Sequence, residues 1–114
     1  MQYEAPVWEP LIEAVGERLV ATFMWMHEEE LEDGCALQAY KHIHTRHYLY
    51  LTNDGDAFER SPCGGFVSAR LDHAIERALC SWWILSDWDA DDAEAVRDAV
   101  MRASARVLPG DDRW

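Results

Sequence analysis

A run of histidines is the local cluster best suited to metal chemistry in this 114-residue sequence. His42 and His44 are two positions apart, and His47 follows shortly after them. On a strand, residues two apart point the same way at a separation of about 6.5–7 Å, which allows two imidazoles to hold one zinc ion. A zinc site needs at least one further ligand, and the segment contains no carboxylate. The pattern favours an ordinary polar strand end, and a small metal-dependent enzyme using His42 and His44 is the alternative.

Cysteines and paired acids indicate chemistry less strongly. Cys63 lies in a Pro-Cys-Gly-Gly turn, but a nucleophilic thiolate needs a neighbouring base, cation or helix N-terminus that the local sequence does not identify. Cys35, Cys63 and Cys80 form no Cys-x-x-Cys pair, which favours reduced thiols in a cytoplasmic protein. Residues 87–91 have the Asp-x-Asp-x-Asp spacing of a calcium loop without its glycine and closing glutamate. We therefore predict no cofactor.

Acidic residues dominate the charge of the chain. There are 22 acids and 10 basic residues, for a formal net charge of −12. Nine of the acids and one of the basic residues fall within residues 1–33. This charge disfavours direct binding to nucleic-acid phosphates or to anionic membranes. It favours a basic protein partner, which it attracts over long distances.

Two Asp-Gly pairs identify the elements that position these groups. Asp33-Gly34 and Asp54-Gly55 separate runs of alternating apolar and polar residues, which is the pattern of β-hairpins. In the first hairpin, a bulged type I turn with a left-handed Gly34 pairs Leu31 with Cys35. This pairing separates apolar from polar side chains better than a two-residue turn does. In the second hairpin both turn types suit the pattern, so its register stays open.

The bulged turn predicts two faces for the first hairpin. The core face would contain Phe23, Trp25, Leu31, Cys35, Leu37, Ala39 and Ile43, with His27, Glu29 and Lys41 among them. The solvent face would contain Met24, Met26, Glu28, Glu30, Glu32, Gln38, Tyr40, His42 and His44. Its glutamates would project together about 6–7 Å apart, close to the spacing of phosphates along a nucleic-acid strand. Its methionines and tyrosine add apolar contacts typical of protein interfaces.

Helical periodicity flanks the hairpins. The spacing predicts helices from Pro10 to about Ala21 and from about Arg70 to Leu85. A third helix has Asp89 as N-cap, with Trp88 folded over its first turn, and ends at Leu108-Pro109-Gly110. Residues 66–68 are a candidate edge strand. The sequence thus predicts a single α+β domain over residues 1–114. In it, one N-terminal and two C-terminal helices pack on one face of a small antiparallel sheet made of two hairpins and this fifth strand.

These features predict a small acidic, non-enzymatic binding protein located in the cytoplasm. It would act as an inhibitor, antitoxin-like regulator or accessory subunit on a basic protein partner, in the sharpest form by imitating nucleic acid. The predicted docking residues are Met24, Met26, Glu28, Glu30, Glu32 and Tyr40. A structural homodimer is a further alternative. We expect no membrane insertion or secretion, because the sequence has neither a membrane-length apolar run nor a basic-then-apolar leader.

Overall fold

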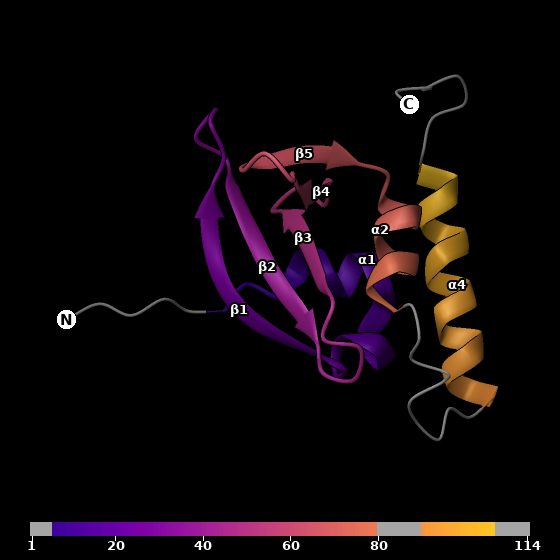
Figure 1. The fold of residues 1–114 in the computed structure, drawn as a ribbon. Helices are drawn as coiled ribbons and strands as arrows, with labels where there is room; N and C mark the ends of the chain where they lie inside the picture. Colours follow the sequence, from indigo (N-terminus) through magenta and orange to yellow (C-terminus); the bar gives the residue numbers. More distant parts are fainter. Residues whose placement is uncertain (1–5, 80–89, 107–114) are drawn as a thin grey trace.

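The computed structural model describes residues 6–79 and 90–106, and within them it shows an α+β fold (Figure 1). Helix α1 (Glu9–Val20) precedes a five-stranded antiparallel sheet, and helices α2 (Leu71–Ala78) and α4 (Ala90–Arg106) follow it. The strands are β1 (Phe23–Glu30), β2 (Ala36–His42), β3 (Tyr48–Thr52), β4 (Ala57–Arg60) and β5 (Phe66–Ala69). Their order in the sheet is the order in the sequence. The predicted fold class is confirmed, including the fifth strand.

Three of the turns between neighbouring strands share one backbone design. In each, a main-chain N–H donates to the carbonyl four residues later, and the third loop residue is a glycine with positive φ. The bonded pairs are Leu31–Cys35, Thr52–Asp56 and Ser61–Gly65, each with an N···O distance of 2.9 Å. The glycines are Gly34, Gly55 and Gly64, with φ of 88°, 90° and 96°. A left-handed glycine at this position closes a type I turn with a bulge. The predicted turn at Gly34 is confirmed, and the second hairpin adopts the same design.

A further bulge in β1 changes the faces of the first hairpin. His27 pairs with Ala39 and Trp25 pairs with Tyr40, so Met26 is an extra residue on β1. A shift of one residue reverses the faces on which paired side chains lie. The predicted pairing is therefore correct from His27 to the turn and wrong before it. Phe23 and Trp25 therefore lie on the same face as Tyr40. The prediction had placed them on the face of Ala39 and Lys41.

The main core lies between the helices and one face of the sheet, which we call the covered face. Its fully buried large side chains are Leu11, Leu19, Tyr40, Leu49, Leu51, Ile75 and Leu79. The opposite face, which we call the open face, has a smaller cluster of Leu37, Ala39 and Tyr50, packed by Leu31, Phe58 and Phe66. Each of these residues comes from a strand or from the first hairpin turn. Figure 1 shows the helices grouped on the other side of the sheet.

Helix α1 is bent where it crosses the covered face. The helix begins at Glu9, one residue before the predicted Pro10, and Gly16 has φ 85° and ψ 162°, which is not helical. This region of backbone conformation is accessible almost exclusively to glycine. A Cβ atom at this position would lie 3.4 Å from the side chain of Arg102 on α4. Gly16 therefore allows α1 to follow the core and to approach α4 closely.

Helices α2 and α4 are joined by the buried carboxylate of Asp72. It accepts two hydrogen bonds from Arg70, at 3.0 and 2.6 Å, and one from the Ser104 hydroxyl at 2.9 Å. Burial raises the pKa of this carboxyl, but these hydrogen bonds outweigh burial and hold the pKa below its usual 3.8. The predicted extension of the second helix to Leu85, and the cap formed by Trp88 and Asp89, lie outside the described residues.

Candidate functional site

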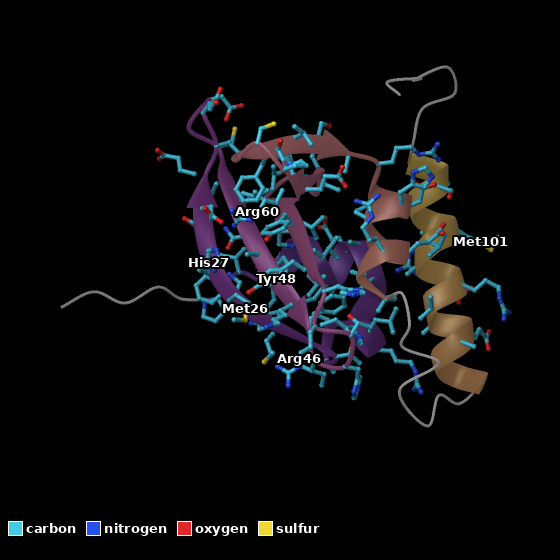
Figure 2. All side chains as sticks on the ribbon, in the orientation of Figure 1. Met26, His27, Arg46, Tyr48, Arg60 and Met101 are labelled. Atoms are coloured by element: carbon cyan, nitrogen blue, oxygen red, sulfur yellow. The ribbon has the colours of Figure 1, made fainter. Side chains whose placement is uncertain are left out.

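Strand β1 forms one edge of the sheet and carries most of the predicted docking residues. Met24 and Met26 are each 38% exposed. Glu28 and Glu30 in β1, and Glu32 in the turn that follows, are exposed as well. We call these five residues the acidic rim. Figure 2 shows Met26 on the side of the molecule opposite α4. Because of the bulge at Met26, Met24 pairs with Lys41 and has the orientation of the open face, whereas Glu28 pairs with Gln38 and has that of the covered face.

Tyr40 is not part of the acidic rim, and the prediction that it faces solvent is wrong. Its side chain is 0% exposed and packs against Trp8, with ring centroids 5.9 Å apart. Its hydroxyl donates a hydrogen bond to the main-chain carbonyl of Val7. Burial raises the pKa of this phenol. The reason is the pairing of Tyr40 with Leu49 on the neighbouring strand, because Leu49 faces the helices. The tyrosine ring supplies apolar surface to the core, and its hydroxyl reaches a hydrogen-bond acceptor.

A buried glutamine positions the first glutamate of the rim. Gln38 is 0% exposed, and its carbonyl accepts a hydrogen bond from the Trp25 indole at 2.9 Å. Its amide group donates to Glu28 at 2.9 Å and to the side-chain carbonyl of Asn53 at 3.2 Å. The polar atoms of Gln38 are thus satisfied, as burial requires. The Glu28 carboxylate is held at the edge of the sheet while its side chain stays exposed.

Glu29 on β1 has ionic partners, and the glutamates of the acidic rim differ from it in this respect. Glu29 lies 3.2 Å from the Arg60 guanidinium and 3.1 Å from the His27 ring. In the part of the chain that the structure describes, no ion pair involves Glu28, Glu30 or Glu32. The rim therefore presents negative charge that no described cation neutralises, and this charge is available to a partner.

His42, the first proposed metal ligand, belongs to the core, and its predicted place on a solvent face is wrong. It is 0% exposed, and its Nδ1 accepts hydrogen bonds from the main-chain N–H groups of His44 and Thr45, both at 3.2 Å. These bonds close the loop between β2 and β3. Burial, assisted by the charges of His44 and His47, lowers the pKa of His42 to about 4. The ring is neutral at pH 7, and its Nδ1 serves as a turn cap.

The other histidines do not complete a metal site with His42. His44 is exposed, with its ring centroid 5.4 Å from that of His42. His47 Nδ1 lies 2.9 Å from the main-chain oxygen of Arg77. Over residues 6–79 and 90–106 no three His, Cys, Asp or Glu side chains are arranged to hold a metal ion. The calcium-like spacing at residues 87–91 is not covered by the described ranges.

The two described cysteines, Cys35 and Cys63, lie in hairpin turns, where their main-chain N–H groups take part in the hydrogen bonding of the turn. Cys63 is exposed, and its main-chain N–H donates to the Ser61 hydroxyl at 3.2 Å within the turn. Cys35 is exposed at the first turn, where its N–H donates to Asp33 at 3.0 Å. The Asp33 carboxylate raises the pKa of the Cys35 thiol. Cys35 is therefore a poorer nucleophile than an ordinary cysteine.

Sequence reasoning missed an aromatic and cationic group on the open face. Tyr48 and Tyr50 stack with ring centroids 5.5 Å apart and an interplanar angle of 11°. Phe66 meets Tyr50 edge-on at 4.9 Å. The Arg60 guanidinium lies 6.0 Å from the Tyr50 centroid and 5.0 Å from that of Phe66. Alternation along β3 predicted that the two tyrosines share a face, but the other members come from β4 and β5 and had no local signal.

Comparison with protein-family models, curated proteins and solved structures finds no match to this chain. Its sites are therefore assigned from geometry and chemistry. Among the helices that the structure describes, none has both the length and the apolar character needed to cross a membrane.

Proposed function

We propose that this chain is a non-enzymatic binding protein whose acidic rim engages a basic protein partner. One observation carries the proposal: a single edge strand and its turn expose two methionines, each 38% exposed, and three glutamates along one edge of the sheet. Methionine supplies adaptable apolar contact, and the carboxylates supply attraction and orientation. The protein then acts as an inhibitor, antitoxin-like regulator or accessory subunit. Tyr40 takes no part in docking.

The geometry of β1 favours docking through side chains over addition of a strand to the sheet. The bulge at Met26 interrupts the register of the edge. Bulges and charged side chains are devices that oppose pairing with a further strand. A partner therefore meets the rim with basic side chains. The net charge of −12 accelerates the encounter at low ionic strength.

The finer proposals concern the partner and the location of the protein. Glu28 and Glu30 occupy alternate positions of a strand, about 6–7 Å apart, so the rim resembles a short row of phosphates. We propose that it occupies the nucleic-acid groove of its partner. The free, exposed thiols of Cys35 and Cys63 support a reducing, cytoplasmic location.

Affinity capture with a charge-matched pair of variants tests the proposal. The rim variant carries Glu28→Gln, Glu30→Gln and Glu32→Gln. The control carries Glu13→Gln, Glu17→Gln and Glu76→Gln, three exposed glutamates on α1 and α2. Both variants lose three negative charges, so they differ in the position of the change. We expect wild type and control to retain a basic protein at about 50 mM salt, and the rim variant to retain at least tenfold less.

The outcomes are separable. Equal losses in both variants would show that net charge alone attracts the partner, and no loss in the rim variant would contradict the proposal. Double-stranded DNA, added as competitor, tests the finer form. Release of the captured protein by DNA supports occupation of a nucleic-acid groove, whereas retention at saturating DNA contradicts it.

A further inference from the structure

Strands β3 and β4 separate at one end, and a pocket opens between them. They pair at two positions, Tyr50 with Phe58 and Leu51 with Ala57, although β3 begins at Tyr48 and β4 continues to Arg60. Beyond the last pair lies a pocket of about 410 Å³. This volume falls within the range of about 300–1,000 Å³ that small-molecule sites occupy. The pocket is distinct from the acidic rim, because β2 lies between β1 and β3.

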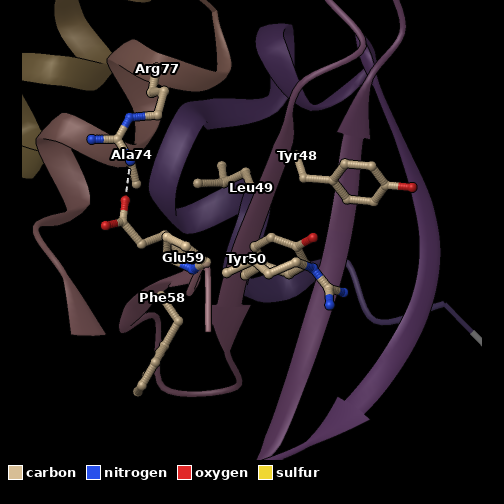
Figure 3. A pocket seen from close by; sticks show the side chains of 9 residues that line it. Tyr48, Leu49, Tyr50, Phe58, Glu59, Ala74 and Arg77 are labelled. Carbon is tan, nitrogen blue, oxygen red and sulfur yellow. Dashed lines mark hydrogen bonds and ion pairs between the residues drawn. The ribbon is translucent and has the colours of Figure 1, made fainter. Parts of the chain in front are cut away.

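The walls of the pocket combine flat aromatic rings with cations. Figure 3 shows Tyr48 and Tyr50 on one side, and Glu59 with Arg77 of α2 on the other. The stacked tyrosine rings present a platform whose outer member, Tyr48, is 37% exposed. A planar aromatic ligand gains stacking energy on such a platform. Such a platform favours a flat ring over a branched aliphatic group.

Two arginines give the pocket a local positive charge in a strongly acidic protein. Arg60 and Arg77 both line it, whereas Glu59 is its one lining acid within the part of the chain described. Arg77 is paired with Glu59, and Arg60 contacts Glu29 outside the pocket through one Nη atom at 3.2 Å. A guanidinium has five N–H donors. The Arg60 side chain is 57% exposed, so it keeps donors for a second anion beside the tyrosine rings.

We propose that this pocket binds a small planar aromatic carboxylate. Its ring lies against Tyr48 and Tyr50, and its carboxylate accepts hydrogen bonds from Arg60. Charge-assisted hydrogen bonds of a guanidinium with a carboxylate are roughly twice as strong as neutral ones. The carboxylate and the ring thus make separable contributions. Neither depends on the acidic rim or on its partner.

Three probes of similar size separate the contributions of charge and ring. These are 2-naphthoate, its neutral amide 2-naphthamide, and the saturated anion decahydro-2-naphthoate. Binding is measured by NMR titration of the ¹⁵N-labelled full chain, which also locates the site. We expect 2-naphthoate to shift the amides of β3 and β4 and to bind about tenfold more tightly than either other probe. Tenfold corresponds to one charge-assisted hydrogen bond or one good ring stack.

Variants assign each contribution to a residue. Arg60→Gln should weaken 2-naphthoate about tenfold and leave 2-naphthamide unchanged, whereas Tyr48→Leu should weaken both aromatic probes. Arg97→Gln, an exposed arginine on α4, is the charge-matched control and should change neither. Equal affinity for the three probes, shifts confined to another surface, or no binding at 5 mM would overturn the proposal. An unaltered ¹⁵N spectrum of each variant outside the pocket excludes misfolding as the cause.

Discussion

The covered and open faces of the sheet hold their polar side chains in different ways. On the covered face, the Tyr40 hydroxyl, the Nδ1 atom of His42 and the Gln38 amide each have a defined hydrogen-bond partner. On the open face, Arg60 and Tyr48 combine ring contacts and ion pairs with partial exposure. A polar atom in a core must be satisfied by the protein, whereas a surface group can share its hydrogen bonds with water. We infer that the covered face provides most of the stability and leaves the open face available for binding.

The largest test of this difference compares two leucines. Leu51 on the covered face and Leu37 on the open face are both 0% exposed. We expect Leu51→Ala to lower the free energy of unfolding by about 4 kcal/mol and Leu37→Ala by about 2 kcal/mol. Three of the neighbours of Leu37 (Leu31, Phe58 and Phe66) are partly exposed and can relax into the cavity, whereas those of Leu51 are fixed between the sheet and helices. Urea denaturation measures both values, and equal losses would remove the distinction between the faces.

A second test uses the pH dependence of stability. Burial lowers the pKa of His42 to about 4 in the folded protein, whereas the unfolded chain has a value of about 6.5. Between these values the unfolded chain binds a proton that the folded protein does not, so stability rises with pH. We expect the contribution of His42 to be fully present above about pH 6.5. Its loss on lowering the pH to 4 should reduce the free energy of unfolding by about 3 kcal/mol.

Two asparagine variants assign this pH dependence. The side-chain oxygen of His42→Asn can accept hydrogen bonds from the same turn amides without titrating, so this variant should lose the slope between pH 4 and 6.5. His44→Asn changes an exposed neighbour and should keep most of the slope. The explanation would fail if the slope disappeared in the His44 variant and persisted in the His42 variant.

A third test concerns the bend that fits α1 to the covered face. Gly16→Ala should destabilise the protein by about 2 kcal/mol, because φ 85° with ψ 162° strains any other residue. Gly64→Ala is the control: its φ is 96°, but a Cβ there meets no atom within 4 Å. We expect the control to lose about 1 kcal/mol, since strain in a left-handed turn is smaller. Thermal unfolding measures the stability of both variants. A larger loss of stability for Gly64→Ala than for Gly16→Ala would contradict this explanation.

The smallest test removes one hydroxyl from each face. Tyr40→Phe should cost about 1 kcal/mol, because the partly buried carbonyl of Val7 loses its donor. Tyr48→Phe should change stability by less than about 0.5 kcal/mol, since this hydroxyl is on an exposed side chain. Chemical denaturation of both variants gives the comparison. A larger loss for Tyr48→Phe would place an unrecognised hydrogen bond on the open face.

Local signals were sufficient to predict the turns and the order of elements. Gly34 closes its turn as expected because a left-handed glycine satisfies a local requirement. The bulge at Met26 had no such signal, since it depends on which neighbours Phe23 and Trp25 meet across the strands. The burial of Tyr40 was also decided elsewhere in the sequence, by the packing of β3 against the helices.

The two candidate sites also differ in how far the local sequence predicts them. The exposed methionines and glutamates of the acidic rim alternate along the chain, so alternation predicted that they reach solvent on one face. They are exposed, but the bulge at Met26 turns Met24 to the opposite face from Glu28 and Glu30. The pocket combines Tyr48, Arg60 and Arg77 from three elements. Its shape depends on the separation of β3 from β4, which neither strand encodes by itself. His42 was misassigned because a side chain that caps a turn from within the core has the same local pattern as one that faces water, whereas His44 is exposed as predicted.

The order of the strands also determines when each face becomes protected during synthesis. All pairing of the sheet is complete by Ala69, whereas α2 and α4 come later in the chain. Each hairpin closes over a short loop, which makes pairing rapid and local. Until α2 and α4 have left the ribosome, Leu49 and Leu51 lie on strands that only α1 can shield. We expect the nascent chain to be most prone to aggregate in this interval.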